Sequence, residues 1–159
     1  MSTASEQEGG ENPCPQKFVV RPIGFVRWEE GAQADELRAE QRRERTARLE
    51  VLPEYEGGLR DIEAFSHLQV FCWLHRSSGF SLLVTPPIDT VEHGVFATCS
   101  PARPNSIGYW VVELVERRGR VLMVRGIDAF EGTPVIDLKP YFPSLARPEA
   151  TEGWAEGKG

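Results

Sequence analysis

The stretch I-G-Y-W-V-V-E-L-V-E at residues 107–116 is the longest strand-like run of this 159-residue chain, and it decides the fold class. It is followed by R-R-G-R at 117–120 and by V-L-M-V-R-G at 121–126. Two β-prone runs that are separated by a short turn containing glycine predict an antiparallel hairpin. We therefore expect a fold that is built mainly from β-strands.

Shorter strand-like runs lie on both sides of this hairpin. Residues 46–52 alternate between apolar and charged side chains, which is typical of a half-buried strand. Residues 67–75 are almost all apolar and predict a central strand. Further strand-like runs lie at 18–28, where Pro22 and Gly24 predict a bend, and at 81–85, 94–98 and 135–138. Such short strands, with turn signals about every 8–12 residues, predict an antiparallel sandwich or barrel.

Residues 35–45 form the one segment of the chain with a helix-like composition. Residues 35–45 have strong helix propensity but almost no apolar face, so a solvated helix and a mobile loop both fit them. Strands and helices do not alternate, and neither a dinucleotide-binding fingerprint nor a Walker loop is present. We expect an all-β, mainly antiparallel, single-domain barrel at 17–146 with short helical or loop insertions. The polar segments 1–16 and 147–159 are expected to be loose tails.

Composition narrows the class of protein further. The net charge is −6, and acidic side chains near both ends carry most of it, which leaves about −1 on residues 16–147. A general polyanion binder is therefore excluded, although a local basic patch for RNA is not. We expect no membrane span and no signal peptide, because no apolar run is long enough and the first residues are acidic. Three widely spaced cysteines fit a reducing cytoplasm and predict no metal site.

The loop at residues 93–108, H-G-V-F-A-T-C-S-P-A-R-P-N-S-I-G, carries the first candidate binding residues. Pro101 and Pro104 stiffen the backbone around Arg103, and Asn105 follows them. The arginine offers a planar fork for a carboxylate or a phosphate, and the asparagine can read a donor and an acceptor together. The alternative is a rigid turn whose arginine pairs with a surface acid. Cys99 in the same loop is either an inert filler or a thiol activated by Arg103.

A second loop at residues 126–141, G-I-D-A-F-E-G-T-P-V-I-D-L-K-P-Y, is acidic. Asp128, Glu131 and Asp137 lie within ten positions without a histidine, and their spacing is not that of a calcium loop. A cationic ligand is therefore favoured over a metal ion, and a solvated acidic turn is the alternative. His67 and His75 flank the apolar strand and are expected to be structural. A Ser66–His67 dyad is not expected, because adjacent side chains of a strand point to opposite faces.

Five segments, taken in order, resemble the TsaA-like family, which is also called the TrmO-like tRNA methyltransferases. They are I-G-F-V-R at 23–27, G-G-L-R-D-I-E-A-F-S-H-L at 57–68, W-L-H at 73–75, G-V-F-A-T-C-S-P-A-R-P-N-S-I-G at 94–108 and D-A-F-E-G-T-P-V-I-D-L-K-P-Y at 128–141. The resemblance implies a compact β-barrel that binds S-adenosylmethionine, in a homodimer with the site near the subunit interface. It also implies methyl transfer to the exocyclic amine of threonylcarbamoyl-adenosine, which lies beside the anticodon of certain tRNAs.

By position, the resemblance also implies a set of site residues. The cofactor-binding residues that it implies are His75, Arg76, Cys99, Arg103, Asn105, Tyr109, Asp128, Glu131, Gly132, Thr133 and Pro134. Tyr109 directly follows the stiff loop and could flank a planar ring. The residues do not single out a catalytic base, and transfer to an aryl amine requires no covalent nucleophile.

The chain departs from the family pattern at several positions. Cys99 stands where the family usually has arginine, which removes a cation that could hold a carboxylate or an RNA phosphate. Ser106 replaces a proline, Phe130-Glu131-Gly132 replaces Leu-Asp-Gly, and a family Pro-Arg-Gln segment has only a loose counterpart at Glu40-Gln41. Three hypotheses therefore stand: a tRNA methyltransferase, a methyltransferase with another acceptor, and a non-catalytic protein that senses S-adenosylmethionine through a partner.

Overall fold

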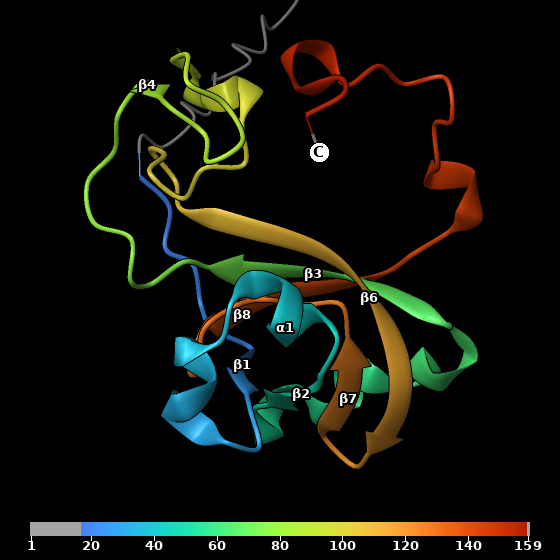
Figure 1. Cartoon of the computed structure of the whole chain (residues 1–159). Coiled ribbons are helices and arrows are strands. Elements are labelled where there is room, and N and C mark those ends of the chain that lie inside the picture. The colour runs from blue at the N-terminus through green and yellow to red at the C-terminus, as the bar shows by residue number, and fades with distance from the viewer. Residues whose placement is uncertain (1–16, 159) are drawn as a thin grey trace, which may run out of the picture.

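A computed structural model describes residues 17–158 of the chain, and Figure 1 shows the elements. Six strands close into a barrel in the order β1-β2-β7-β6-β3-β8, and every neighbouring pair is antiparallel. Their bounds are Gly24–Arg27 (β1), Thr46–Val51 (β2), His67–Trp73 (β3), Ile107–Arg118 (β6), Val121–Arg125 (β7) and Pro134–Pro140 (β8). The expected all-β, mainly antiparallel fold is confirmed. Of the sandwich and the barrel that the strand pattern predicts, the structure is a barrel.

The β6–β7 hairpin that the sequence predicts is present, with its strands extending further into the turn than expected. Arg118 pairs with Val121, so that only two residues connect the strands. One of them, Gly119, has a φ of 59°, which a residue with a side chain adopts only at a cost. The pairing register shifts between Leu114 and Glu116, and such a bulge increases the local twist that a small barrel needs to close.

The barrel interior is filled by alternate residues of its strands. Along β2, Ala47, Leu49 and Val51 are buried, as their alternation predicts. β3 also alternates, although its sequence is nearly all apolar, and the strand ends at Trp73 rather than His75. The strand is central in its pairing, since β6 and β8 flank it, but only one face of a barrel strand points inward. The buried core comprises Val26, Trp28, Ala34, Ala47, Leu49, Val51, Leu59, Leu68, Val70, Cys72, Val112, Leu122, Val124, Ile127, Ala129 and Val135.

Short helices occupy the connections at both ends of the barrel. Residues 35–45 contribute to two of them, η1 (Gly31–Glu36) and α1 (Ala39–Arg43), between β1 and β2. Two more, η2 (Pro53–Leu59) and η3 (Ile62–Ala64), lead into β3. The predicted strand at 18–28 is shorter than expected, and β1 begins only after Pro22, whose ring removes a backbone donor.

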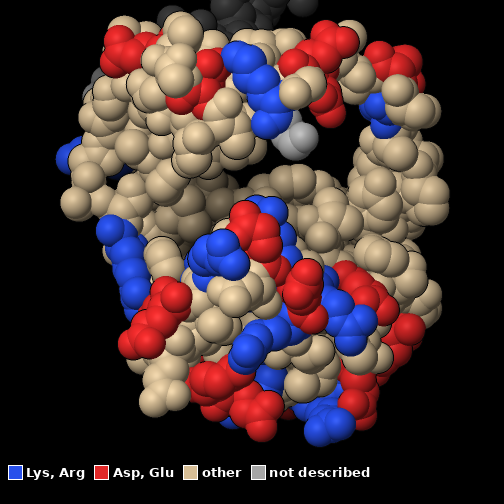
Figure 2. Space-filling model, in the orientation of Figure 1, with Lys and Arg blue, Asp and Glu red and all other residues tan. Residues whose placement is uncertain are grey.

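An excursion at residues 74–106 rises from the barrel between β3 and β6 (Figure 1). It holds a small two-stranded sheet of β4 (Leu83–Val84) and β5 (His93–Gly94). The single turn η4 (Val95–Ala97) follows, in place of the strand-like run expected at 94–98. Figure 2 shows the molecular surface hollowed between the barrel and this excursion.

The chain after β8 passes through η5 (Pro143–Leu145) and η6 (Gly153–Ala155) and returns to the excursion. The Trp154 ring stacks on His93 with 4.1 Å between ring centroids, and its Nε1–H donates to the carbonyl oxygen of Ala97 at 2.8 Å. The segment 147–158, expected as a loose tail, thus contacts the loop that carries the first candidate residues. The other expected tail, 1–16, lies outside the described residues. None of the described helices is long and apolar enough to cross a bilayer.

Candidate binding site at the barrel rim

A hollow of about 380 Å³ opens at the rim of the barrel beneath the excursion. Five separate parts of the chain line it: α1, the turn that follows β3, the proline-containing loop of the excursion, β6, and the loop between β7 and β8. Its lining is Ala39, Arg42, Leu74, His75, Arg76, Ser77, Cys99, Pro101, Trp110, Asp128, Ala129, Phe130 and Thr133. Five of the residues predicted from the sequence therefore meet here, namely His75, Arg76, Cys99, Asp128 and Thr133.

A second hollow of about 860 Å³ adjoins the first, and Leu74, Cys99, Trp110 and Asp128 line both. It adds three more predicted residues, Arg103, Asn105 and Tyr109. The two proline-containing loops, which are separated in the sequence by residues 109–125, thus converge on one end of the barrel. Both volumes lie in the range of about 300–1,000 Å³ that is common for small-molecule sites.

Asp128 is the one charged residue among the four that line both hollows. Its Oδ1 accepts a hydrogen bond from the Nε1–H of Trp110 at 2.8 Å, and its Oδ2 forms an ion pair with Arg43. Only 15% of the side chain is exposed. Partial shielding from water strengthens the interaction of this carboxylate with any nearby charge, and Arg43 already offsets part of its negative charge.

Arg103 shapes its own loop. One nitrogen, Nη1, donates to the carbonyl oxygens of Thr98 at 2.9 Å and Ser100 at 3.2 Å. The loop is also tied to the turn after β3, since the Ser77 hydroxyl donates to the carbonyl oxygen of Pro101 at 2.8 Å. The expected stiffness is therefore supplied by hydrogen bonds as well as by prolines, and the arginine pairs with carbonyl groups rather than with a surface acid.

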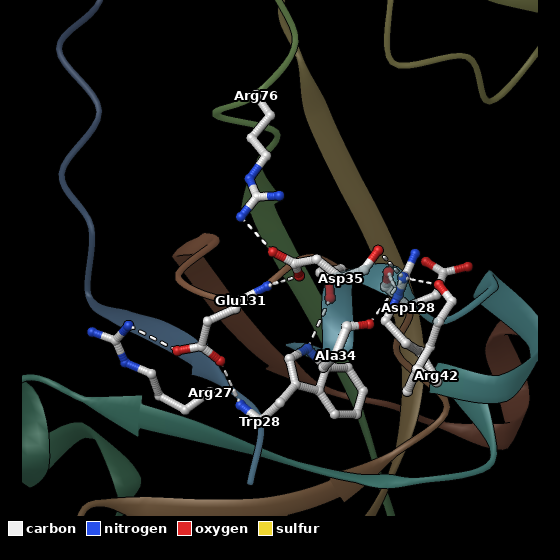
Figure 3. A network of polar contacts seen from close by, with 10 residues as sticks. Arg27, Trp28, Ala34, Asp35, Arg42, Arg76, Asp128 and Glu131 are labelled. Carbon is white, nitrogen blue, oxygen red and sulfur yellow. Dashed lines mark hydrogen bonds and ion pairs between the residues drawn. The ribbon is translucent and has the colours of Figure 1, made fainter. Parts of the chain in front are cut away.

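Three predicted residues of the second loop do not line the two hollows. The Glu131 carboxylate points toward β1, where its Oε2 accepts the backbone N–H of Trp28 at 2.7 Å and its Oε1 pairs with Arg27 at 3.1 Å (Figure 3). Gly132 has a φ of 75° at the third position of a turn, where glycine is favoured. Pro134 begins β8 and faces a different hollow beside Trp73. The acidic loop is thus divided, with Asp128 at the hollows and Glu131 in the framework.

Sequence reasoning missed two residues that organise this site, Asp35 and Arg42. Arg42 is 6% exposed, and its Nε donates to the carbonyl oxygen of Asp128 at 2.7 Å. The guanidinium groups of Arg42 and Arg76 each lie 4.8 Å from the centre of the Phe130 ring, which is a favourable cation–π distance. The only sequence signal was the charged run at 35–45, which does not show which of its arginines is buried.

The remaining candidates behave as framework groups. The thiol of Cys72 is buried, and loss of hydration raises its pKa to about 12, so it stays protonated and unreactive. Ser66 and His67 are hydrogen-bonded, with 2.9 Å between Oγ and Nδ1, which corrects the expectation that they point apart. Ser66 precedes β3, so the alternation of strand side chains does not govern it. Among residues 17–158, no cluster of three His, Cys, Asp or Glu side chains could hold a metal ion.

The fold is a small closed antiparallel barrel, and the two adjoining hollows at its rim, lined by apolar, aromatic and a few charged side chains, form a candidate ligand site. The comparison with known families agrees with this description. Residues 36–146 match the model of the tRNA-methyltransferase O N-terminal domain, and the chain belongs to that family. The family that the five sequence segments indicated is therefore confirmed.

Individual relatives are similar over most of the chain. A probable S-adenosyl-L-methionine-binding protein of Pyrococcus abyssi is 42% identical over 144 residues, covering 89% of this chain and 78% of its own length. Another such protein, from Archaeoglobus fulgidus, is 55% identical over 112 residues, covering 70% of this chain and 31% of its own length. The tRNA (adenine(37)-N6)-methyltransferase of Rattus norvegicus is 36% identical over 100 residues, which are 61% of this chain and 23% of that protein.

Solved structures agree with the fold. A crystal structure of TrmO from Pseudomonas aeruginosa superposes with a TM-score of 0.67 at 32% identity, covering 89% of this chain and 63% of that one. The present chain thus spans less than two thirds of the crystallised protein and about a third of the first Archaeoglobus relative.

Proposed function

We propose that this chain binds S-adenosylmethionine at the barrel rim and is a methyltransferase that acts on tRNA. The acceptor in this proposal is the exocyclic amine of threonylcarbamoyl-adenosine beside the anticodon. The observation that carries it is the convergence of both candidate loops on two adjoining hollows, both of which Asp128 lines. The names of the relatives support it, since several are described as S-adenosyl-L-methionine-binding proteins and others as tRNA methyltransferases.

The residues at the hollows fit such a cofactor chemically. When bound, S-adenosylmethionine supplies a methyl group on a positively charged sulfur. Asp128 offers a shielded carboxylate to such a cation, alongside its ion pair with Arg43. Tyr109 and Trp110 offer aromatic surface for a planar base. His75 and Arg76 line the smaller hollow and provide hydrogen-bond donors there. The role of the protein is to hold both partners in line, because a neutral aryl amine needs positioning more than activation.

Two observations favour a second candidate, in which the acceptor is not this tRNA base or the protein only senses the cofactor. Cys99 stands at the junction of the two hollows, where the family usually has an arginine. In addition, arginines and acids are interleaved over the barrel surface (Figure 2), and several of the arginines are paired, as Arg45 is with Glu30 and Arg125 with Glu113. Paired arginines attract RNA phosphates less than free ones do.

The proposal also includes a homodimer of this chain, in which the binding site lies close to the subunit interface. The excursion exposes large apolar side chains, and Phe96 is the most exposed of them at 75%. The others are Phe80, Leu82, Leu83, Ile88 and Val91. An accumulation of exposed apolar side chains on one segment is typical of an interaction surface. Since Phe96 also lines the larger hollow, a partner that covers this surface would lie beside the cofactor. We place the protein in the cytoplasm together with its tRNA.

Isothermal titration calorimetry of the full chain with S-adenosylmethionine tests the cofactor. Wild type is expected to release or absorb heat with a single-site isotherm. Asp128→Asn is expected to weaken binding about tenfold or more, because a charge-assisted contact is worth about 1.5–3 kcal/mol. Asp61→Asn is the matched control, because it makes the same change at a left-handed position that asparagine tolerates, just before η3 and outside the two hollows. No heat and no thermal shift at millimolar cofactor would refute the proposal.

Mass spectrometry of tRNA nucleosides tests the acceptor. A strain that lacks this protein and has no paralogue is expected to lose methylated threonylcarbamoyl-adenosine, and the wild-type gene should restore it. Persistence of that nucleoside at its normal level, with cofactor binding intact, would reject the tRNA acceptor and favour the second candidate. Cys99→Arg tells whether the departure from the family pattern matters, since unchanged affinity and turnover would show that it does not.

A further inference from the structure

The carboxylate of Asp35 joins three parts of the chain that are far apart in the sequence (Figure 3). Its Oδ1 accepts the backbone N–H of Glu131 at 2.8 Å, and its Oδ2 accepts a hydrogen bond from Nη2 of Arg76 at 2.5 Å. The side chain of Asp35 is 12% exposed. One carboxylate on η1 therefore connects the turn after β3 with the loop between β7 and β8, and both of these segments line the smaller hollow.

The backbone that carries Asp35 is itself fastened by Arg42. This guanidinium donates to the carbonyl oxygens of Ala34 at 3.3 Å and of Leu37, while its Nε reaches the carbonyl oxygen of Asp128. These carbonyl groups belong to the insertion between β1 and β2 and to the loop between β7 and β8. The Asp35 carboxylate thus has a defined position relative to the residues that it contacts.

The Asp35 carboxylate restricts the conformation of the Arg76 side chain. Its side chain is about half exposed and lines the smaller hollow. An unrestrained arginine side chain samples many rotamers, and fixing it costs about 2 kcal/mol of conformational entropy. The ion pair with Asp35 removes part of that freedom before a ligand binds. Only Nη2 is occupied by this pair, which leaves the other donors of the fork for a ligand.

We propose that Asp35 is a positioning residue, which holds the Arg76 guanidinium and the loop at 128–133 in the geometry that ligand binding requires. The proposal rests on the proposed function of the hollow. Asp35 does not line either hollow and acts through its partners. The positioning role predicts that the contribution of Asp35 to ligand affinity disappears when residue 76 can no longer form the ion pair with Asp35.

A double-mutant cycle measured by calorimetry with S-adenosylmethionine tests this link. Asp35→Asn and Arg76→Gln are each expected to weaken binding about tenfold, and the double variant no more than either, because contacting residues couple by about 0.5–3 kcal/mol. Asn keeps the shape of Asp and one acceptor for the Glu131 N–H, so the fold is retained. Glu36→Gln is the matched control, since Glu36 is an exposed neighbour without an ion pair among the described residues.

Hydrogen exchange of the Glu131 backbone amide gives a readout that needs no ligand. Exchange is expected to accelerate in Asp35→Ala and to stay at the wild-type rate in Glu36→Gln. Additive losses in the cycle, wild-type affinity of Asp35→Asn, or unchanged exchange in Asp35→Ala would each overturn the positioning role. Absence of binding by the wild-type chain would instead refute the proposed function, and the exchange experiment would still decide whether Asp35 holds the loop.

Discussion

Gly24 is the residue where a single methyl group would disturb the barrel most directly. A Cβ at this position would lie 2.4 Å from the carbonyl oxygen of Glu50 and 3.0 Å from the Cα of Val51. Both atoms belong to the backbone of β2, which cannot move aside without breaking its pairing with β7. Gly24→Ala is therefore expected to lower the free energy of unfolding by about 1–3 kcal/mol, the usual cost of overpacking. Urea unfolding followed by circular dichroism measures it.

Gly57→Ala is the matched control, because nothing lies within 4 Å of the added methyl group and the backbone φ is not positive. Its free energy of unfolding is expected to stay within about 0.5 kcal/mol of wild type. Equal stability of the two variants would contradict the close approach of β1 and β2 at Gly24.

At the scale of elements, the C-terminal segment is held on the excursion by Asp89. Lys158 donates to its Oδ2 at 2.5 Å, and Nε2 of His93 lies 2.9 Å from the same oxygen. The hydrogen bond from Lys158, then that with His93 and then the N–H of Thr90 lower the pKa of Asp89 far below its usual value. Its contribution to stability is present above about pH 4, the ordinary pKa of an aspartate, and is lost as the pH falls toward the lowered value.

The contact of Trp154 with the excursion is therefore expected to loosen in acid. Exchange of the Trp154 indole N–H, followed by NMR from pH 7 to pH 3, should accelerate below about pH 4. In Asp89→Asn, exchange is expected to be faster at neutral pH and to show a smaller acid step, while Asp61→Asn keeps the wild-type profile. A profile of Asp89→Asn that matches wild type would show that this carboxylate does not hold the segment.

At the scale of the whole molecule, the exposed apolar surface of the excursion predicts self-association. Sedimentation equilibrium is expected to show a dimer, with twice the chain mass of 17.8 kDa, for wild type. The mass of Phe96→Glu is expected to shift toward that of the monomer. Phe96 is exposed, so the monomer is expected to stay folded. Tyr55→Glu, a change at an exposed aromatic residue on η2, is the control and should remain dimeric. A monomeric wild type would remove the basis for a site beside a subunit interface.

The sequence alone located most strands of this barrel and the position of its two loops along the chain, although β1 is shorter than expected and residues 95–97 form a helical turn. The alternation in 46–52, the run at 107–116 and its glycine turn depend on neighbours within a few residues, and local sterics and burial decide them. The prolines around Arg103 likewise marked the rim loop, since their effect on φ is local. The family resemblance then brought Asp128 and Thr133 into the same set of candidates.

Only the tertiary structure decided which charged groups of that set face the hollows and which hold the framework. Asp128 and Glu131 are three positions apart and look equivalent in the sequence, yet one lines both hollows and the other pairs with Arg27. Asp35 and Arg42 looked like members of a solvated charge run, but their partners lie up to 96 positions away. Closure of the barrel places those partners, and a local pattern holds no information about contacts that form between segments so far apart in the chain.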